Sequence, residues 1–469
     1  MNRKTYSNMF FAFSAQSISV ILSILTSMVL PKFLGVTNYA YWQLFIFYSV
    51  YINLLHFGVS DGIYLRIGGE SYRNIDKQVI YSQLKLLVFI QIIISAILLT
   101  ILTAIGLNSD RLFVFYNLFI YMVVYNSVVF FGFVFQAVNE TRIHSMAFII
   151  DKITFIIIMV ILLFAGVRDY RKFIIGYNIS ATLALIFISL QGKEILSQKF
   201  IGIKKTIQEM MININIGMKL MISAVASNFI VGSTRIVVDK YMGITEFGKL
   251  SFSFSIVNFL LAFVRQVSMV LFPALRQFEK KHLTSFFERI SLMLDIFLPV
   301  ILIGYFPINV FFSIWLPAYK DSLYYLRYLL PVVIFDGKAQ LLFFTFMKVF
   351  REEKKLLYIN LACLVCSFLS ALFLVNIFHN ITYIVFTVMI ILAMRSIYME
   401  FYLRKKYFTI DYRILYLVII VSCFVTSAIL FPGVRGMIIY ISFYLIYLLV
   451  RKKEIKALYM SFKSKKIKN

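Results

Sequence analysis

The chain has 469 residues, of which 61% are hydrophobic and only 14% are charged. Soluble globular proteins are about 45–50% apolar and about 25% charged. The composition therefore excludes a soluble enzyme, a disordered chain and a collagen, and it indicates a polytopic membrane protein. Lys and Arg number 47 against 21 Asp and Glu, a formal net charge of +26. In a soluble protein this excess would suggest nucleic acid, but in a membrane protein it must first be compared with the topology.

Apolar runs recur along the chain, and most have the length of about 20 residues that a helix needs to cross a bilayer. They predict an all-α fold with about fourteen transmembrane helices. The predicted spans, in chain order, are 9–31, 41–63, 79–107, 112–138, 144–167, 173–190, 212–238, 249–275, 290–314, 323–347, 356–378, 381–401, 414–431 and 436–450.

The distribution of Lys and Arg predicts the orientation of these spans. An even number of spans places both termini on the same side of the membrane, and the positive-inside rule makes that side the cytoplasm. Most of the 47 basic residues then fall in cytoplasmic segments, and the basic segment 451–469 would lie against the anionic lipids of the inner leaflet. Orientation in a cytoplasmic membrane thus explains most of the charge excess, and we expect membrane lipids, not nucleic acid, as partners.

A smaller group of charges lies within the predicted spans, where charge is costly unless it is paired or faces a water-filled cavity. Two sets of neighbours are expected to neutralise each other, Asp151 with Lys152 and Asp336 with Lys338. The basic residues predicted inside spans are Lys85, Lys152, Lys219, Arg235, Arg265, Arg327, Lys338 and Arg395.

An internal repeat relates the two halves of the chain. Residues 31–40 align without gaps on residues 239–248, with identical Lys, Gly and Thr. Six predicted spans separate the copies, so both run in the same direction across the membrane. This pattern predicts two pseudo-symmetric six-helix lobes, 1–206 and 207–401, followed at 402–469 by two extra helices and a basic tail. In transporters built from parallel repeats the substrate lies between the lobes near mid-bilayer.

Polar residues follow one face of the span at 249–275. Ser251, Ser255, Asn258 and Arg265 are separated by three- and four-residue steps through Ala262, which places them on one helical face. Packing through small residues is an equally good account of each serine. Arg265 lies deep in its span, so it is expected either to face a cavity or to pair with a carboxylate such as Asp295 or Asp61.

Two further spans carry polar stripes of the same kind. In the span at 212–238, Asn228, Gly232, Arg235 and Asp239 share one face, with Lys219 on an adjoining face. Arg235 and Asp239 are also spaced as an i,i+4 ion pair. The span at 41–63 contributes the polar residues Asn53, His56, Ser60 and Asp61. His56 has the residue type that titrates near neutral pH, although a lone histidine is more often a packing residue.

No pattern for catalysis, a cofactor or a metal emerges. The three cysteines, Cys363, Cys366 and Cys423, all fall in apolar runs, and no Cys/His set has zinc-ligand spacing. The CxxC of Cys363 and Cys366 is interpreted as two packed thiols. We therefore predict no metal, no cofactor and no enzymatic activity.

Two stretches carry a resemblance to a known family. They are Pro31 to Tyr39 followed by His56 to Gly62, and, in the second half, Arg235 to Gly248 followed by Leu271 to Leu275. These residues resemble bacterial polysaccharide and O-antigen flippases of the multidrug/oligosaccharidyl-lipid/polysaccharide exporter superfamily. Many members of that superfamily have an acid just before the arginine in the seventh span, where this chain has Thr234.

The resemblance implies a flippase in the bacterial inner membrane that moves a polyprenyl-diphosphate-linked oligosaccharide, an O-antigen or capsule unit of lipopolysaccharide-type biosynthesis, to the outer leaflet. Arginine's planar fork suits phosphate oxygens. We therefore expect Arg265, Arg235 and Lys219 to bind the diphosphate, with Asn258, Ser255, Asn228 and Asn53 solvating the glycan. Asp61, His56 and Asp239 are candidates for coupling to a proton or Na⁺. A polysaccharide polymerase is a possible partner.

Three other functions are compatible with parts of this pattern. A flippase for a lipid-linked precursor of peptidoglycan or teichoic acid would be mechanistically similar, and the sequence does not separate it from the flippase above. A multidrug or cation antiporter of the same superfamily would require acids in the cavity, whereas the seventh and eighth spans contribute Arg235 and Arg265 against Asp239. A membrane glycan polymerase or acyltransferase would require a catalytic constellation, and no such set is evident in the sequence.

Overall fold

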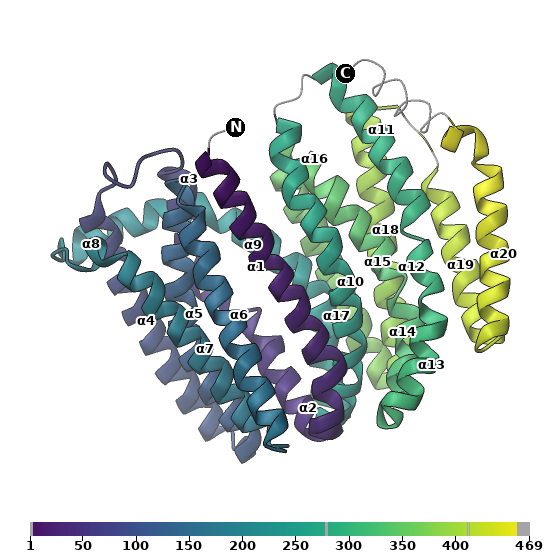
Figure 1. The fold of residues 1–469 in the computed structure, drawn as a ribbon, viewed down its shortest axis with the longest axis horizontal. Coiled ribbons are helices and arrows are strands. Elements are labelled where there is room, and N and C mark those ends of the chain that lie inside the picture. Colours follow the sequence, from purple (N-terminus) through teal and green to yellow (C-terminus); the bar gives the residue numbers. More distant parts are fainter. Residues whose placement is uncertain (1–2, 277–279, 410, 412, 457–469) are drawn as a thin grey trace. The chain divides into compact units, whose positions relative to one another are not determined.

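The computed structural model describes residues 3–276, 280–409, 411 and 413–456, with the side chains at 3–7, 9, 220, 263, 265–276 and 280–282 outside that description. Every regular element in these residues is helical (Figure 1). The helices of the first half are α1 (Arg3–Ile24), η1 (Leu25–Val29), α2 (Leu30–Ser49), η2 (Ile52–His56), α3 (Val59–Arg66), α4 (Lys77–Ala104), α5 (Ser109–Ala137), α6 (Thr141–Phe164), α7 (Tyr170–Gln191), α8 (Lys193–Leu196) and α9 (Ile203–Met242). The second half contains α10 (Ile244–Arg276), α11 (Lys280–Phe297), α12 (Val300–Ile303), α13 (Tyr305–Trp315), η3 (Pro317–Tyr319), α14 (Lys320–Leu329), α15 (Val332–Lys338), η4 (Ala339–Phe343), α16 (Phe344–Val349), α17 (Glu353–Phe378), α18 (Ile381–Tyr407), α19 (Ile414–Leu430) and α20 (Val434–Val450).

These helices confirm the prediction of an all-α polytopic membrane protein. Among the described residues, nine helices are long and apolar enough to span a bilayer, or ten if the bent pair Pro317–Leu329 and Val332–Val349 is one span. The shorter apolar helices α19 and α20 follow. Each of the fourteen predicted spans overlaps a helical segment. The chain is therefore a multi-pass membrane protein.

Short polar residues set where several long helices begin. Asp76 accepts hydrogen bonds from the backbone N–H groups of residues 78 and 79, which caps α4. Asn108, Asp169 and Asn380 cap α5, α7 and α18 in the same way. Such caps satisfy N–H groups that have no partner inside the helix, a need that is most acute where water is scarce.

The repeat has a counterpart in the backbone. Gly35 has a φ of 70° and Gly243 a φ of 90°, and these two residues are aligned by the repeat. Positive φ is easily adopted only by glycine. Gly35 breaks α2 within the region between the first two predicted spans, and Gly243 separates α9 from α10. A glycine with positive φ therefore occurs at equivalent places in both halves of the sequence.

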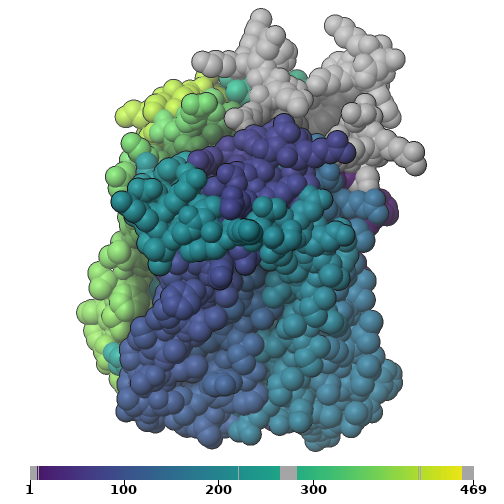
Figure 2. Space-filling model, turned by 90° about the vertical axis from the view of Figure 1, so that its left-hand side faces the viewer, coloured from purple at the N-terminus to yellow at the C-terminus, as the bar shows by residue number. Residues whose placement is uncertain are grey.

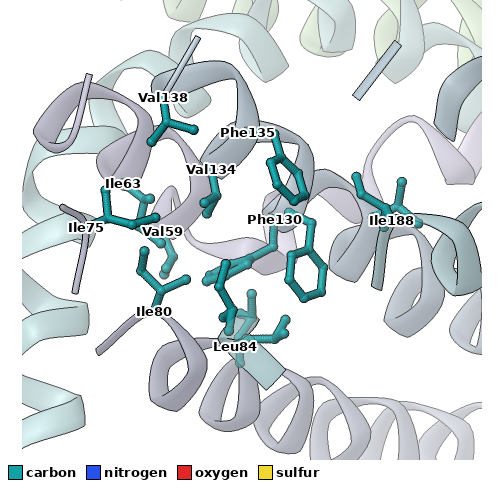
Figure 3. Close-up of a cluster of buried hydrophobic side chains, with 14 of the residues drawn as sticks. Val59, Ile63, Ile75, Ile80, Leu84, Phe130, Val134, Phe135, Val138 and Ile188 are labelled. Carbon is teal, nitrogen blue, oxygen red and sulfur yellow. The ribbon is translucent and has the colours of Figure 1, made fainter. Parts of the chain in front are cut away.

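The chain divides into two compact units, Met1–Gly232 and Ser233–Asn469. In the N-terminal unit, α5 packs against α2, α3, α4, α6 and α7. One core cluster in this unit includes Ile63, Ile80, Phe130, Phe135 and Ile188, from α3, α4, α5 and α7 (Figure 3). The boundary of the units lies within α9, and the predicted lobes 1–206 and 207–401 remain a prediction.

Three glycines bring α3 and α9 into backbone contact inside the N-terminal unit. A Cβ at Gly62 would lie 2.0 Å from the Asn213 carbonyl oxygen, and one at Gly217 would lie 2.1 Å from the Gly58 carbonyl oxygen. Gly58 and Gly62 are spaced as in a GxxxG motif, which permits close helix crossing in membranes. Figure 2 shows the purple-blue segment around α3 and the teal start of α9 side by side at one end of this unit.

In the C-terminal unit, Pro299 lies at the break between α11 and α12. Proline has no N–H, so the carbonyl of Asp295, four residues earlier, has no donor from the helix. The hydroxyl of Tyr447 on α20 donates to this carbonyl at 2.7 Å. Tyr444 and Tyr440, on the same face of α20, donate to the carbonyls of Ile296 and Pro299. These bonds fasten α20 to the break and satisfy backbone oxygens that lipid cannot.

Candidate substrate-binding site

Arg235 is held in a defined orientation within the C-terminal unit. It lies near the end of α9 and is only 9% exposed. Its Nη2 donates to the hydroxyl of Ser251 on α10 at 2.7 Å. The guanidinium lies 5.0 Å from the centre of the Phe247 ring, within the range of a cation–π contact. The structure therefore brings together Arg235 and the first polar residue of the predicted α10 stripe.

The rest of the α10 stripe is divided between helix packing and exposure. The Ser255 hydroxyl donates to the Ser251 carbonyl one turn earlier, which is the usual bond of serine inside a helix. Asn258, one turn further along the same face, is exposed. The Arg265 side chain lies outside the described residues, so its predicted role is not addressed by the geometry. Asp239 is 8% exposed and lies one turn after Arg235.

The predicted site residues of the N-terminal unit come from α9 and the segment after α2. Lys219 and Asn228 are both exposed on α9. The backbone carbonyl of Asn228 accepts a hydrogen bond from the Tyr51 hydroxyl, which ties α9 to the segment that carries Asn53. The side-chain Oδ1 of Asn53 is buried and accepts no hydrogen bond from the described residues.

His56 and Asp61 lie close together at the α3–α9 crossing. Nε2 of His56 is 3.7 Å from Oδ2 of Asp61, and Nδ1 of His56 accepts a hydrogen bond from the backbone N–H of Gly58. That bond fixes Nδ1 as an acceptor, so a proton on a neutral His56 resides on Nε2, facing Asp61. The two coupling candidates of this unit thus form one pair.

The charges predicted to neutralise each other follow two different outcomes. Asp151 and Lys152 do pair, at 2.7 Å, and Ser180 also donates to Asp151. The pairing of Asp336 with Lys338 is wrong. Asp336 instead pairs with Arg395. Residues two apart on a helix point to different sides, so each finds its partner on another element.

Lys338 is the centre of a buried ionic network that the sequence analysis missed. Its ammonium donates to Asp295 at 2.6 Å and to Glu400 at 2.7 Å, and all three side chains are at most 1% exposed. Glu400 also binds Arg404 one turn later, and Asp295 lies 3.5 Å from Arg451. The i,i+4 spacing of Glu400 and Arg404 was the one sequence signal for it. The alternative in which Asp295 serves Arg265 has a competitor, because Asp295 already faces two cations.

The described residues contain no group of three or more His, Cys, Asp or Glu side chains placed to hold a metal ion. The cations with predicted roles lie on α9 and α10, and the ion pairs described above lie on other elements. What this arrangement offers chemically is an oriented guanidinium, exposed amides and a buried amide oxygen without a donor. Such groups bind anions and hydroxyls.

Comparisons with known proteins agree with this description. The sequence profile of the polysaccharide biosynthesis protein family matches residues 6–279. No curated protein sequence matches the chain significantly.

Solved structures share the fold. The lipid II flippase MurJ in an inward closed conformation aligns with a TM-score of 0.68 and 15% identity over 96% of this chain and 99% of that one. An inward-facing multidrug resistance MATE family transporter of the MOP superfamily aligns with a TM-score of 0.58 and 12% identity, over 87% of this chain and 99% of that one. A MOP superfamily transporter from Pyrococcus furiosus aligns with a TM-score of 0.52 and 12% identity, over 90% and 97% of the two chains. At these identities the likeness establishes the fold alone.

Proposed function

Because the chain belongs to the polysaccharide biosynthesis protein family, we propose that it is a flippase for a polyprenyl-diphosphate-linked oligosaccharide. The cargo is an O-antigen or capsule repeat unit, moved from the cytoplasmic to the outer leaflet of the bacterial inner membrane by alternating access. In this proposal both termini are cytoplasmic and the protein acts as a transporter, not as an enzyme. The fold that the chain shares with the lipid II flippase MurJ supports a cargo carried on a lipid.

The observation that carries this proposal is the fixed guanidinium of Arg235 in the spanning part of α9. A diphosphate carries about two negative charges, and each charge-assisted bond from arginine to a phosphate oxygen is roughly twice as strong as a neutral one. Preorganising Arg235 through Ser251 and Phe247 reduces the rotamer entropy lost on binding. We assign the diphosphate to Arg235, Arg265 and Lys219.

The amides provide for the glycan. Asn258 and Asn228 are exposed on α10 and α9, and Oδ1 of Asn53 is a buried acceptor without a donor. A buried polar atom that lacks a partner costs free energy, which a sugar hydroxyl would restore by donating to it. Ser255 contributes less, because its hydroxyl is already bonded within α10.

For energy coupling we propose the pair His56 and Asp61, with Asp239 as a second candidate. A proton or Na⁺ at Asp61 would change the charge next to the α3–α9 crossing, where helix backbones touch. This proposal rests on the 3.7 Å distance between His56 Nε2 and Asp61 Oδ2.

The test is translocation of a fluorescent lipid-linked oligosaccharide in proteoliposomes that contain the purified full-length protein. We expect R265A and R235A to slow translocation at least about tenfold, because each removes a charge-assisted contact. R435A is the matched control, since Arg435 is exposed near the start of α20. If R265A and R235A both moved the cargo as fast as wild type, the cationic site would be refuted.

A multidrug or cation antiporter is the second candidate, because the chain also shares its fold with a MATE family transporter. The same proteoliposomes distinguish the antiporter from the flippase. Ion-driven accumulation of a cationic dye, without movement of lipid-linked oligosaccharide, would establish the antiporter and overturn the flippase. A glycan polymerase or acyltransferase is tested by the length and acylation of the glycan, which we expect to be unchanged after incubation. A polysaccharide polymerase is then a partner protein, not an activity of this chain.

A further inference from the structure

Arg327, a half-buried residue of α14, differs from four buried cations of the C-terminal unit. Lys338, Arg395, Arg404 and Arg451 each have a carboxylate within 4.0 Å. Among the described residues, no carboxylate lies that close to Arg327, and its buried Nε has no hydrogen-bond acceptor. An arginine in a membrane-spanning segment without a counter-ion is costly and is by default a candidate functional residue.

Two tyrosines of its own helix flank this guanidinium. Tyr324 and Tyr328 lie three residues before and one residue after Arg327 on α14, with ring centres 4.6 and 5.1 Å from the guanidinium carbon. Tyr328 is packed against Phe386 of α18 and is 9% exposed, whereas Tyr324 is 51% exposed. The rings hold the cation by cation–π contacts. These contacts do not neutralise its charge, and they do not occupy the N–H groups that lie in the guanidinium plane.

Two acids at this helix are already engaged. Asp321, in the first turn of α14, binds Lys249 at 2.8 Å, and Glu246 binds the same ammonium at 2.9 Å. Glu246 also accepts a hydrogen bond from the hydroxyl of Tyr325, the residue that follows Tyr324 on α14. Neither of these two carboxylates forms an ion pair with Arg327.

We propose that Arg327, with the hydroxyls of Tyr324 and Tyr328, binds the phosphate of a membrane lipid. The arginine fork donates in plane to two phosphate oxygens, and a tyrosine hydroxyl donates to a third. Lys320 begins α14 at an end that the predicted orientation places outside, so Arg327 lies about 10 Å inward at 1.5 Å per residue. The headgroup region takes up roughly 5–7 Å of each leaflet, so from this depth the long arginine side chain can extend back to the outer-leaflet phosphates. Only the assignment of this site to the outer leaflet rests on the proposed function and orientation.

One chemistry, a lipid phosphate, has two sources: a phospholipid headgroup or the diphosphate of the cargo carrier after it has crossed. Native mass spectrometry of the purified full-length protein separates them with three probes, phosphatidylglycerol, undecaprenyl diphosphate and uncharged dioleoylglycerol. We expect R327Q to weaken binding of phosphate-bearing lipid about tenfold and to leave dioleoylglycerol unchanged. R327K should recover only part of the affinity, because lysine lacks the fork. R435Q, which removes an exposed arginine, is the matched control.

Weakening for both phosphate probes assigns the site to phospholipid headgroups, and weakening for undecaprenyl diphosphate alone assigns it to the cargo carrier. Either result supports phosphate recognition. Unchanged binding of both in R327Q overturns the proposal and means that the arginine only reaches toward water. If R327Q does not fold, the Y324F/Y328F double variant keeps the cation and removes the two hydroxyls, and unchanged phosphate binding in a folded double variant would refute their part in the site. These measurements need no translocation, so their failure is distinct from failure of the flippase function.

Discussion

Replacing Lys338 with Met tests whether the C-terminal unit depends on its buried ionic network. The substitution keeps an unbranched side chain of nearly the same length but leaves Asp295 and Glu400 without the ammonium that joins them. Removing one partner of a buried ion pair costs about 3–5 kcal/mol. Each carboxylate retains a second cation, Arg451 at 3.5 Å and Arg404 at 2.9 Å, so we expect the lower end, about 3 kcal/mol. For a unit of this size that corresponds to a fall in Tm of about 6–12 °C.

Thermal unfolding of the purified protein in detergent measures this effect by intrinsic fluorescence. The two tryptophans, Trp42 and Trp315, lie in different units. A W42F background therefore reports the C-terminal unit through Trp315. K354M is the control, because Lys354 is exposed. The triple variant D295N/K338M/E400Q should recover at least half of the loss, since it removes the uncompensated charges together. A Tm for K338M within 2 °C of wild type, roughly the effect of 1 kcal/mol or less, would show that the network contributes little stability.

Three further outcomes follow from the packing. G62A should prevent folding or lower the yield of monodisperse protein in size-exclusion chromatography, because its Cβ would lie 2.0 Å from the Asn213 carbonyl oxygen, whereas G337A, with nearest atoms at 3.5 Å, should be tolerated; equal yields would contradict the close crossing. Y447F should lower thermal stability by about 1–3 kcal/mol because the Asp295 carbonyl loses its donor, and the exposed Tyr358 supplies the Y358F control. K152M should destabilise the N-terminal unit, because it leaves the buried Asp151 carboxylate with only the Ser180 hydroxyl as a partner. D151N/K152M should restore most of the lost stability in the same unfolding assay. A double variant as unstable as K152M would argue against charge burial as the cause.

The sequence predicted the helices well because hydrophobic periodicity and length are local properties. The repeat is a property of the sequence itself, and Gly35 and Gly243, which it aligns, both have positive φ. Ion partners were harder to predict, because they depend on which helices become neighbours. Asp151 and Lys152 lie close enough in sequence to pair, but Asp336 and Lys338 point to different sides of their helix and bind α18 separately.

The candidate site was predictable only where residue type dictates the environment. An arginine in a span must be satisfied, so Arg235 was identified, but its partners Ser251 and Phe247 depend on how α9 and α10 pack. The serines were ambiguous from the start, because a helix offers each hydroxyl a carbonyl one turn earlier. Ser255 takes that option. Asn53 shows the opposite case, a buried amide oxygen that the fold leaves without a donor, which no spacing pattern reveals.

The charges inside the spans therefore fall into two classes, those that join helices to one another and those that we propose bind substrate. Asp295 is bound through its carboxylate to Lys338 and through its carbonyl to Tyr447, so one residue joins α11, α15 and α20 at the proline break. The proposed alternating access by rocking would require each predicted lobe to move as a body, and cross-links of this kind would stiffen the broken helices of the C-terminal unit. Arg235, in contrast, is oriented by a hydroxyl and a ring. We therefore expect K338M to lower thermal stability while the translocation rate of the folded fraction stays near wild type. We expect R235A to slow translocation while its thermal stability stays near wild type. A K338M variant that is stable but slow would place Lys338 in the transport site instead.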